Sequence, residues 1–185
     1  MNATPGQTVG PFFHLGLPYT GGNELVPATH RDAVRLHGRV LDGAGDPVPD
    51  ALIELWQAAP DGRVPREPGS LRRDGWTFTG WGRAGTDPAG RYWFSTLRPG
   101  APFFALTVFA RGLTDRLFTR AYLPAAPDVL AADPLLASLP PQRRHTLLAV
   151  PDEPGLRFDV RLQGEDETVF LELARRASSL PDLRR

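Results

Sequence analysis

The sequence predicts an all-β protein, a β-sandwich of mixed or antiparallel strands with an extended N-terminal arm and one short helical segment. Gly (19) and Pro (20) are spread through the 185 residues and separate short apolar runs, a pattern typical of sandwiches and barrels. Several runs alternate apolar and polar residues, as strands with one buried face do. The length suits one domain, so we expect a single domain over 1–185, with an arm over 1–30 and a frayed tail over 175–185.

The N-terminal segment, residues 2–22, is rich in Gly and Pro, yet it also carries apolar side chains: Val9, Phe12, Phe13, Leu15 and Leu17. A disordered tail has fewer apolar residues than this. We therefore expect an extended arm that packs on another surface.

Two strands joined by a tight turn are expected after the arm. Residues 33–41 alternate in type and lead into Asp-Gly-Ala-Gly-Asp at 42–46, which supplies the left-handed conformations of a tight turn. The run 51–57 alternates again and predicts the second strand. Its Glu54 should lie on the face opposite Ile53, because successive side chains of a strand point to opposite faces.

The middle of the chain repeats this succession of turns and strands. Residues 60–75 are rich in Arg, Pro and Gly and are predicted to form a surface loop. After it we expect, in order, a turn at 86–90, a strand at 91–96, a break at 98–102, a strand at 103–110, a turn at 111–115 and a strand at 116–123. The run 103–110 is nearly all apolar, which predicts a strand buried on both faces.

The C-terminal third contains the only plausible helical segment, 127–139, which Pro134 limits to short turns. Residues 143–150 and 156–162 are predicted as two further strands. For residues 166–173 the pattern leaves a strand and a short helix equally open.

Composition excludes several chemistries. All 21 basic residues are Arg, 21 Asp and Glu balance them, and the chain has no Cys. Without Cys or Lys there is no disulfide, thiolate nucleophile, Schiff base or P-loop. Balanced charge argues against a nucleic-acid partner. The absence of a long apolar run or a signal-peptide pattern predicts no membrane partner and a cytoplasmic location.

The polar residues by themselves form no catalytic or metal-binding constellation. The four His, at positions 14, 30, 37 and 145, show no ligand spacing, and His37 within an alternating strand is interpreted as a structural or surface residue and not as a ligand. No Gly-x-Ser-x-Gly motif occurs. The acidic cluster 165–167 is interpreted as a solvated turn. We therefore expect no catalytic residue and no metal ligand in this chain.

Two features exceed this unremarkable pattern. In the arm, residues 4–12 combine Gly, which permits close approach of the backbone, with Pro, which stiffens it. Arg111 directly follows the most apolar run of the chain, where its guanidinium could bind a carboxylate through two hydrogen bonds. The alternative for Arg111, a turn residue in a surface salt bridge, remains equally open.

Six segments of the sequence resemble the intradiol ring-cleavage dioxygenases, over nearly the whole chain, from about Thr4 to about Leu173. They are TPGQTVGPFF, RVLDGAGDPVPDALIELWQA, GWGRAGTDPAGRYWFSTLRPG, VFARGL with LFTRAYL, PQRRHTLLA and RFDVRLQGEDETVF. The second is typical of the whole family. FARGL, TRAYL and QGEDETVF are more typical of alpha chains, which pair with a homologous beta chain.

The resemblance implies a β-sandwich and an assembly of several alpha–beta pairs. In the family the beta chain holds one non-haem Fe(III) through two Tyr and two His. The reaction uses O2 to open the ring of 3,4-dihydroxybenzoate, a small aromatic substrate, between its hydroxyl-bearing carbons, and gives 3-carboxymuconate.

The family's iron ligands are missing from this sequence. Val64 stands where a ligand Tyr would follow Gly-Arg, and Phe103 and Ala105 occupy the places of the two His. The second Tyr would follow Gly100, but Ala101 stands there. A phenyl ring or a methyl group cannot coordinate iron, so the resemblance implies an alpha chain that binds no cofactor itself and relies on Fe(III) in the beta chain.

In the family the alpha chain still contributes to the active site of the beta chain. Carried over by motif, the implied substrate-binding residues are Thr8, Gly10, Pro11 and Arg111. Arg111 would help bind the substrate carboxylate. Two positions depart from the pattern, since Phe12 replaces a common Tyr and Phe103 replaces a His often found in alpha chains.

Two other hypotheses remain open. One is a stand-alone, non-catalytic β-sandwich that serves as a binding or interaction module, because a fold does not determine a function. The other is an iron enzyme that uses His14, His37 or His145.

Overall fold

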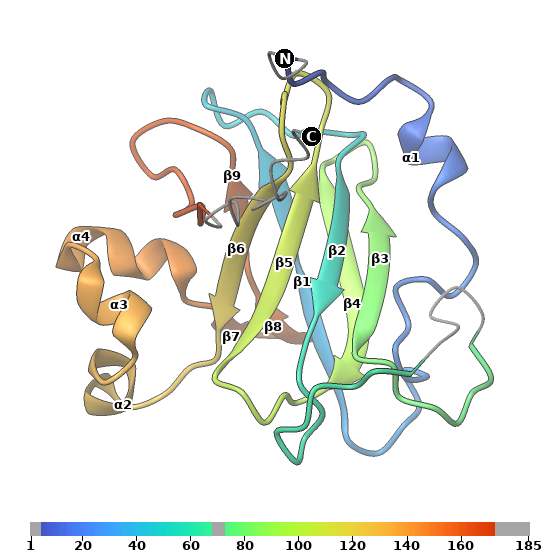
Figure 1. Cartoon of the computed structure of the whole chain (residues 1–185), viewed down its shortest axis with the longest axis vertical. Helices are drawn as coiled ribbons and strands as arrows, with labels where there is room; N and C mark the ends of the chain where they lie inside the picture. The colour runs from blue at the N-terminus through green and yellow to red at the C-terminus, as the bar shows by residue number, and fades with distance from the viewer. Residues whose placement is uncertain (1–4, 68–72, 173–185) are drawn as a thin grey trace, which may run out of the picture.

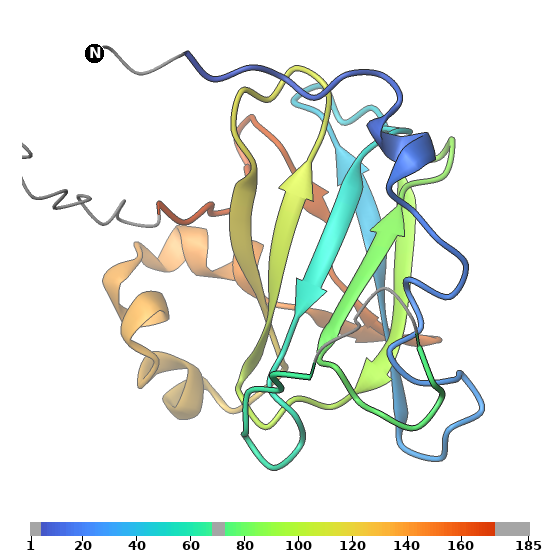
Figure 2. The same ribbon diagram turned by 45° about the vertical axis from the view of Figure 1, so that its right-hand side comes forward.

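The computed structural model describes residues 5–67 and 73–172. In this part of the chain two β-sheets lie face to face (Figures 1 and 2), which confirms the predicted sandwich. Residues 1–4 of the predicted arm and the predicted tail at 175–185 lie outside the described residues.

The four-stranded sheet is antiparallel throughout, with the order β3-β2-β5-β6. Its strands are β2 (Leu52–Trp56), β3 (Trp81–Gly85), β5 (Phe103–Phe109) and β6 (Leu117–Tyr122). β2 and β5 lie at the centre, so the turns that precede β2 and follow β5 meet at one end of this sheet.

The five-stranded sheet is mixed, with the order β4-β1-β8-β7 and β9 paired to β1. Its strands are β1 (Ala33–Leu41), β4 (Arg91–Leu97), β7 (Val150–Asp152), β8 (Gly155–Arg157) and β9 (Val160–Arg161). β1 pairs antiparallel with β4 over seven residues and parallel with β8 and β9. β1 and the edge strand β4 therefore form the longest ladder of this sheet.

The core lies between the sheets and follows the alternation of the sequence. The fully buried side chains come from the inward faces of both sheets: Leu36, Val40, Ile53, Leu55, Phe94, Phe104, Leu106 and Val108. Gln57, just after β2, joins the two layers, because its Oε1 accepts from Thr96 Oγ1 at 2.6 Å and its Nε2 donates to the Leu97 carbonyl at 2.9 Å. This satisfies a buried amide with hydrogen bonds across the sandwich.

The arm packs on the edge strand β3, as predicted. The Arg83 amide donates to the Gly22 carbonyl at 2.8 Å, and Leu25 is buried in the core. β3 itself was not predicted. Two of its five residues are Gly, which is depleted in strands, and they weaken the alternation of apolar and polar residues. The arm also contains the short helix α1 (Phe13–Gly16), which the sequence did not indicate.

Short helices cover the opposite edge, beside β6 (Figure 1). They are α2 (Pro127–Ala131), α3 (Pro134–Ser138), α4 (Pro141–Arg144) and the 3-10 turn η1 (His145–Leu147). The predicted helical segment 127–139 is confirmed as α2 and α3, and Pro134 starts the second helix. Asp133 caps α3 by accepting from the amides of Leu135 and Leu136 at 2.9 and 3.1 Å.

Most predicted strands are confirmed, namely those at 33–41, 51–57, 91–96, 103–110 and 116–123. The expectation that the first two form a pair is wrong, because β1 and β2 belong to different sheets. The strand predicted at 143–150 is wrong, because Pro141 begins a helix there and β7 starts only at Val150. The run 156–162 is split into β8 and β9. Residues 166–172 form neither a strand nor a helix, so both alternatives for 166–173 are wrong within the described residues.

The expectation that 103–110 is buried on both faces is also wrong. Phe103, Ala105 and Phe109 are only half-buried, whereas Phe104, Leu106 and Val108 face the core. The outward face of β5 is therefore accessible in the single chain. No helix in the described part of the chain has the length and apolar character that crossing a membrane requires.

Candidate functional site

Arg111 lies in the turn after β5, and the strand register places a carboxylate beside it. Leu52 of β2 pairs with Phe109 of β5 in antiparallel register. Moving two residues back along one strand and two forward along the other brings Asp50 opposite Arg111. The Arg111 Nε forms an ion pair with Asp50 Oδ2. Arg111 is therefore a turn residue in a salt bridge, as one of the two interpretations predicts, but its partner Asp50 is buried.

The two partners of this pair differ in exposure. The Asp50 side chain is 10% exposed, and the Arg111 side chain is 56% exposed. A guanidinium has five N–H donors, and one carboxylate occupies at most two of them. Arg111 can therefore remain paired with Asp50 and still present N–H groups to a second carboxylate from solvent. The buried Asp50 fixes the position of the guanidinium.

The arm is attached to the same turn. Gly112, which has a φ of +90°, donates its amide to Thr8 Oγ1 at 2.7 Å. Gly6 lies so close to the turn that a Cβ there would be 2.8 Å from the Thr114 carbonyl oxygen. Thr8 and Arg111, two of the four predicted substrate-binding residues, therefore belong to one local constellation.

Gly10 and Pro11 follow on an exposed stretch of the arm that leads away from this turn towards α1 (Figures 1 and 2). No atom that a Cβ on Gly10 would meet lies within 4 Å among the described residues. Both residues are therefore available to a partner, but within the single chain they do not contact Arg111 through any hydrogen bond or ion pair that the described residues form.

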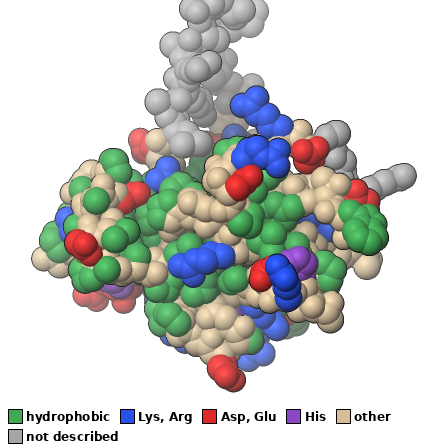
Figure 3. Space-filling view, turned by 90° about the horizontal axis from the view of Figure 1, so that it is seen from below, with side chains coloured by type: hydrophobic (Ala, Val, Ile, Leu, Met, Phe, Trp, Pro, Cys, Tyr) green, Lys and Arg blue, Asp and Glu red, His purple; other side chains and the backbone are tan. Residues whose placement is uncertain are grey.

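Large apolar side chains of the arm are left open beside these residues. Phe12 is 76% exposed, Leu15 69% and Leu17 45%. Exposed apolar groups that gather in one segment are typical of a protein–protein contact. At the opposite end of the molecule, seen from below, hydrophobic side chains are interspersed with charged ones (Figure 3). The arm therefore presents exposed apolar side chains that a partner could cover.

The positions at which the sequence resemblance implies iron ligands carry no side-chain donor atoms that could hold a metal. Phe103 and Ala105 project from the outward face of β5, and Val64 is exposed in the loop after β2. In the described part of the chain no three His, Cys, Asp or Glu side chains come together as a metal site. Iron(III) prefers oxygen and nitrogen ligands, so these residues do not fit the ion.

A cavity of about 550 Å³ lies over β2, β5 and β6, beside Phe103 and Ala105. Phe103 and Ala105 line it, together with Phe118 and Arg120 of β6. The Arg120 guanidinium lies 4.0 Å from the centre of the Phe103 ring, a cation–π contact. The carboxylate at its margin, Glu54, is held by Arg83 Nη2 at 2.6 Å. The cavity is therefore lined by aromatic rings and by side chains that are already engaged in contacts within the chain.

Arg120 also connects this cavity to the helices. Its Nη1 donates to the Tyr122 hydroxyl at 3.1 Å, and that hydroxyl donates to Asp133 Oδ1 at 2.8 Å. Burial raises the pKa of Tyr122 to about 12, and the hydrogen bond to Asp133 acts in the same direction. Tyr122 is therefore a neutral structural phenol at physiological pH.

The histidines do not form a site. His37 Nε2 lies 2.7 Å from Asp152 Oδ1, which confirms its structural interpretation, and His145 lies 3.6 Å from Asp166. His14 lies in α1, where its ring packs edge-on against Phe13 at 5.9 Å. Within the described residues these three side chains belong to separate contacts, so the hypothesis of an iron site built from them has no structural support.

Asp50 is the residue that sequence reasoning missed. Its signal is indirect, since an acidic residue two positions before β2 attracts notice only when the β2–β5 register is known. Pairing of strands that are far apart in the sequence cannot be read from periodicity alone.

The chain was compared with known proteins. A family model described as Dioxygenase matches residues 26–126, more than half of the chain. The protocatechuate 3,4-dioxygenase alpha chain of Burkholderia cepacia is 40% identical over 94% of this chain and 98% of its own. The alpha chain of Pseudomonas putida is 34% identical over 91% and 96%, respectively. The corresponding beta chain of Burkholderia cepacia is 32% identical over 82% and 78%.

Solved structures show the same fold. The dioxygenase domain of a dioxygenase carbohydrate-binding protein fusion from Streptomyces sp. SirexAA-E has a TM-score of 0.56 and 24% identity, over 88% of this chain and 99% of that one. Catechol 1,2-dioxygenase from Pseudomonas arvilla C-1 has a TM-score of 0.56 and 22% identity, over 84% and 61%.

The chain therefore belongs to the intradiol ring-cleavage dioxygenase family. Within this family it is a homologue, over nearly its whole length, of the alpha chains of protocatechuate 3,4-dioxygenase.

Proposed function

We propose that this chain is the alpha subunit of a protocatechuate 3,4-dioxygenase, without iron ligands of its own, and that it completes the active site of an iron-bearing beta chain. The observation that carries the proposal is the combination of full-length similarity to alpha chains with side chains at 64, 103 and 105 that cannot coordinate a metal. The beta chain's Fe(III) supplies the oxygen chemistry of the reaction.

In the proposed reaction 3,4-dihydroxybenzoate takes up both atoms of O2 and becomes 3-carboxy-cis,cis-muconate. The substrate has one carboxylate and the product has three, because each hydroxyl-bearing carbon becomes a carboxylate carbon. This chain's part is recognition: the exposed edge of the Arg111 guanidinium binds the substrate carboxylate, while Asp50 holds the other edge. Charge-assisted, two-point hydrogen bonds fix both the position and the direction of the ring.

The arm supplies the second contribution. Thr8 connects it to the Arg111 turn, and the exposed Gly10 and Pro11 then pass beside the region that a partner would cover. Gly10 permits the backbone to approach a ligand closely, and Pro11 limits the paths available to the chain. Thr8, Gly10, Pro11 and Arg111 together would form this chain's share of the substrate pocket.

The experiment is co-expression with the beta chain. Oxygen uptake with protocatechuate should be high for the co-purified pair and absent for the alpha chain alone. Catechol, which lacks the carboxylate, serves as the control substrate and should be turned over poorly by the same pair. Full oxygen uptake by the lone chain would contradict the subunit assignment, and no activity with any beta chain would favour the stand-alone binding module.

A further inference from the structure

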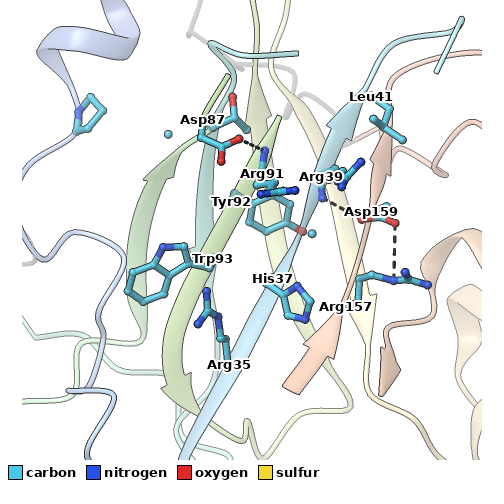
Figure 4. A pocket seen from close by; sticks show the side chains of 14 residues that line it. Arg35, His37, Arg39, Leu41, Asp87, Arg91, Tyr92, Trp93, Arg157 and Asp159 are labelled. Carbon is cyan, nitrogen blue, oxygen red and sulfur yellow. Dashed lines mark hydrogen bonds and ion pairs between the residues drawn. The ribbon is translucent and has the colours of Figure 1, made fainter. Parts of the chain in front are cut away.

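A groove of about 930 Å³ lies on the outer face of the five-stranded sheet, away from the Arg111 turn. Figure 4 shows the side chains that line it, most of which come from β1, β4 and the segment around β8, with Asp87 from the turn before β4. Four of them are arginines: Arg35, Arg39, Arg91 and Arg157. Two carboxylates, Asp87 and Asp159, line the same groove, so positive charge is in excess.

The arginines are poorly neutralised by the chain itself. Among the described residues, no carboxylate forms an ion pair with the guanidinium of Arg35, Arg39 or Arg91. Arg157 Nε lies 3.8 Å from Asp159 Oδ2, a long contact. A cluster of exposed guanidiniums without carboxylate partners is able to bind an added anion.

The carboxylates in the groove are engaged by the backbone. Asp159 Oδ1 accepts from the Arg39 amide at 2.9 Å, and Asp87 Oδ1 accepts from the Arg91 amide at 2.8 Å. These contacts organise a loop and a turn. They involve the backbone amides of Arg39 and Arg91 and not the guanidiniums of these residues.

The strand register sets two of these like charges against each other. Arg39 of β1 and Arg91 of β4 are direct cross-strand partners, and both side chains are exposed on the outer face. Cβ atoms of such partners lie about 5 Å apart, and like charges in this position are destabilising. An oxyanion between the two guanidiniums would turn this repulsion into two charge-assisted contacts.

Further along the groove, Arg35 and His37 are held in place by contacts within the chain. The Arg35 guanidinium lies 4.9 Å from the centre of the Trp93 ring, and His37 is held by Asp152 at 2.7 Å. The indole thus holds Arg35 by a cation–π contact. This second cationic position follows the Arg39–Arg91 pair along the same face of β1.

We infer that this groove is a binding site for a small multivalent oxyanion, with one anionic group between Arg39 and Arg91 and a second at Arg35 or at Arg157, which also line it. A protein partner fits the groove less well, because the most exposed large apolar side chains of the described chain lie outside it and interface centres are rich in such groups. The inference does not depend on the proposed function, although the tricarboxylate product of that reaction belongs to the same ligand class.

The test is calorimetric titration of the purified full-length chain, in the assembly in which it is isolated, at constant low ionic strength. Citrate represents polycarboxylates, inorganic phosphate represents phosphates, and acetate is the monovalent control. Citrate or phosphate should bind at least about tenfold more tightly than acetate, because more than one guanidinium takes part. The stronger of the two identifies the source of the anion.

Variants locate the site. Arg39→Gln and Arg91→Gln should each weaken binding of the preferred anion by about tenfold or more, since each removes a charge-assisted contact. Arg31→Gln is the matched control, because Arg31 is exposed, paired with Asp32 and outside the groove. The affinity of Arg31→Gln for the preferred anion should stay within about twofold of the parent's affinity.

Three results would overturn the inference. The first is equal affinity for acetate and the multivalent anions, and the second is unchanged affinity in both groove variants. The third is loss of assembly in Arg39→Gln or Arg91→Gln, measured by size-exclusion chromatography, which would make the groove a protein interface.

Discussion

Arg111 faces two carboxylates in the proposed complex, the buried Asp50 of its own chain and the carboxylate of the substrate. Removing the guanidinium therefore has two separate effects. It deletes the charge-assisted contact to the substrate, and it leaves Asp50 without its cation in a site where the carboxylate is only 10% exposed. Variants at this position must separate binding from stability.

We predict that Arg111→Ala in the alpha–beta pair raises the KM for protocatechuate. Loss of a hydrogen bond between charged groups costs about 1.5–3 kcal/mol, which corresponds to about a 10- to 150-fold change. Steady-state oxygen uptake measures it. Arg111→Lys keeps a cation for Asp50 and removes the two-point geometry, so it is the control for folding. An unchanged KM in Arg111→Ala would show that Arg111 does not bind the carboxylate.

Asp50 is predicted to act through Arg111. Asp50→Asn keeps the shape of the side chain and removes the charge that orients the guanidinium. KM should rise by roughly 2- to 12-fold, the equivalent of a net hydrogen bond of about 0.5–1.5 kcal/mol, while kcat changes little. A merely structural role would lower the amount of active enzyme and leave KM unchanged. Substitution of both residues should be less than additive, because they form one pair.

The arm is the element that we propose contacts a partner chain, and Thr8 attaches its N-terminal part to the Arg111 turn. Thr8→Val should lose the acceptor for the Gly112 amide, whereas Thr8→Ser should keep it. We predict faster cleavage of the arm by a nonspecific protease in Thr8→Val, by limited proteolysis of the lone chain. A net hydrogen bond of about 0.5–1.5 kcal/mol corresponds to roughly a 2- to 12-fold change in the open population. Equal cleavage of the two variants would contradict this role of Thr8.

The joint between β6 and the helices is predicted to weaken at high pH. The pKa of Tyr122 is raised to about 12 from 10.0, so between these values the folded state keeps a proton that the unfolded state releases. The stabilisation from this group is complete below pH 10 and falls as the pH rises towards 12. Chemical unfolding measured from pH 8 upwards should therefore show that the free energy of unfolding falls more steeply with pH in the parent than in Tyr122→Phe. Parallel curves would contradict the assignment.

At the scale of elements, the sequence predicts what depends on local pattern. Strands with clear alternation and turns rich in Gly or Asp were found where expected, as for β1 and its turn at 42–46. β3 was missed because its Gly residues obscure the alternation. Residues 143–150 were misread because their apolar content resembles a strand, while Pro141 favours a helix start.

At the scale of the molecule, the candidate site could be predicted only in part. Arg111 and the arm were identified from local features and from resemblance, but Asp50 becomes visible only through long-range register. Gly10 and Pro11 are exposed in the single chain, so their proposed role can be seen only in a complex with a partner. A site divided between two chains cannot be completed from one sequence, whereas the missing ligands at 64, 103 and 105 can be read directly.

We propose that this chain contributes substrate recognition, and no metal ligand, to an active site shared with a beta chain. Metal analysis of the purified alpha–beta pair and of each chain alone tests it most directly. We expect one iron for each alpha–beta pair and none above background in the alpha chain alone. One iron bound to each lone alpha chain would contradict it.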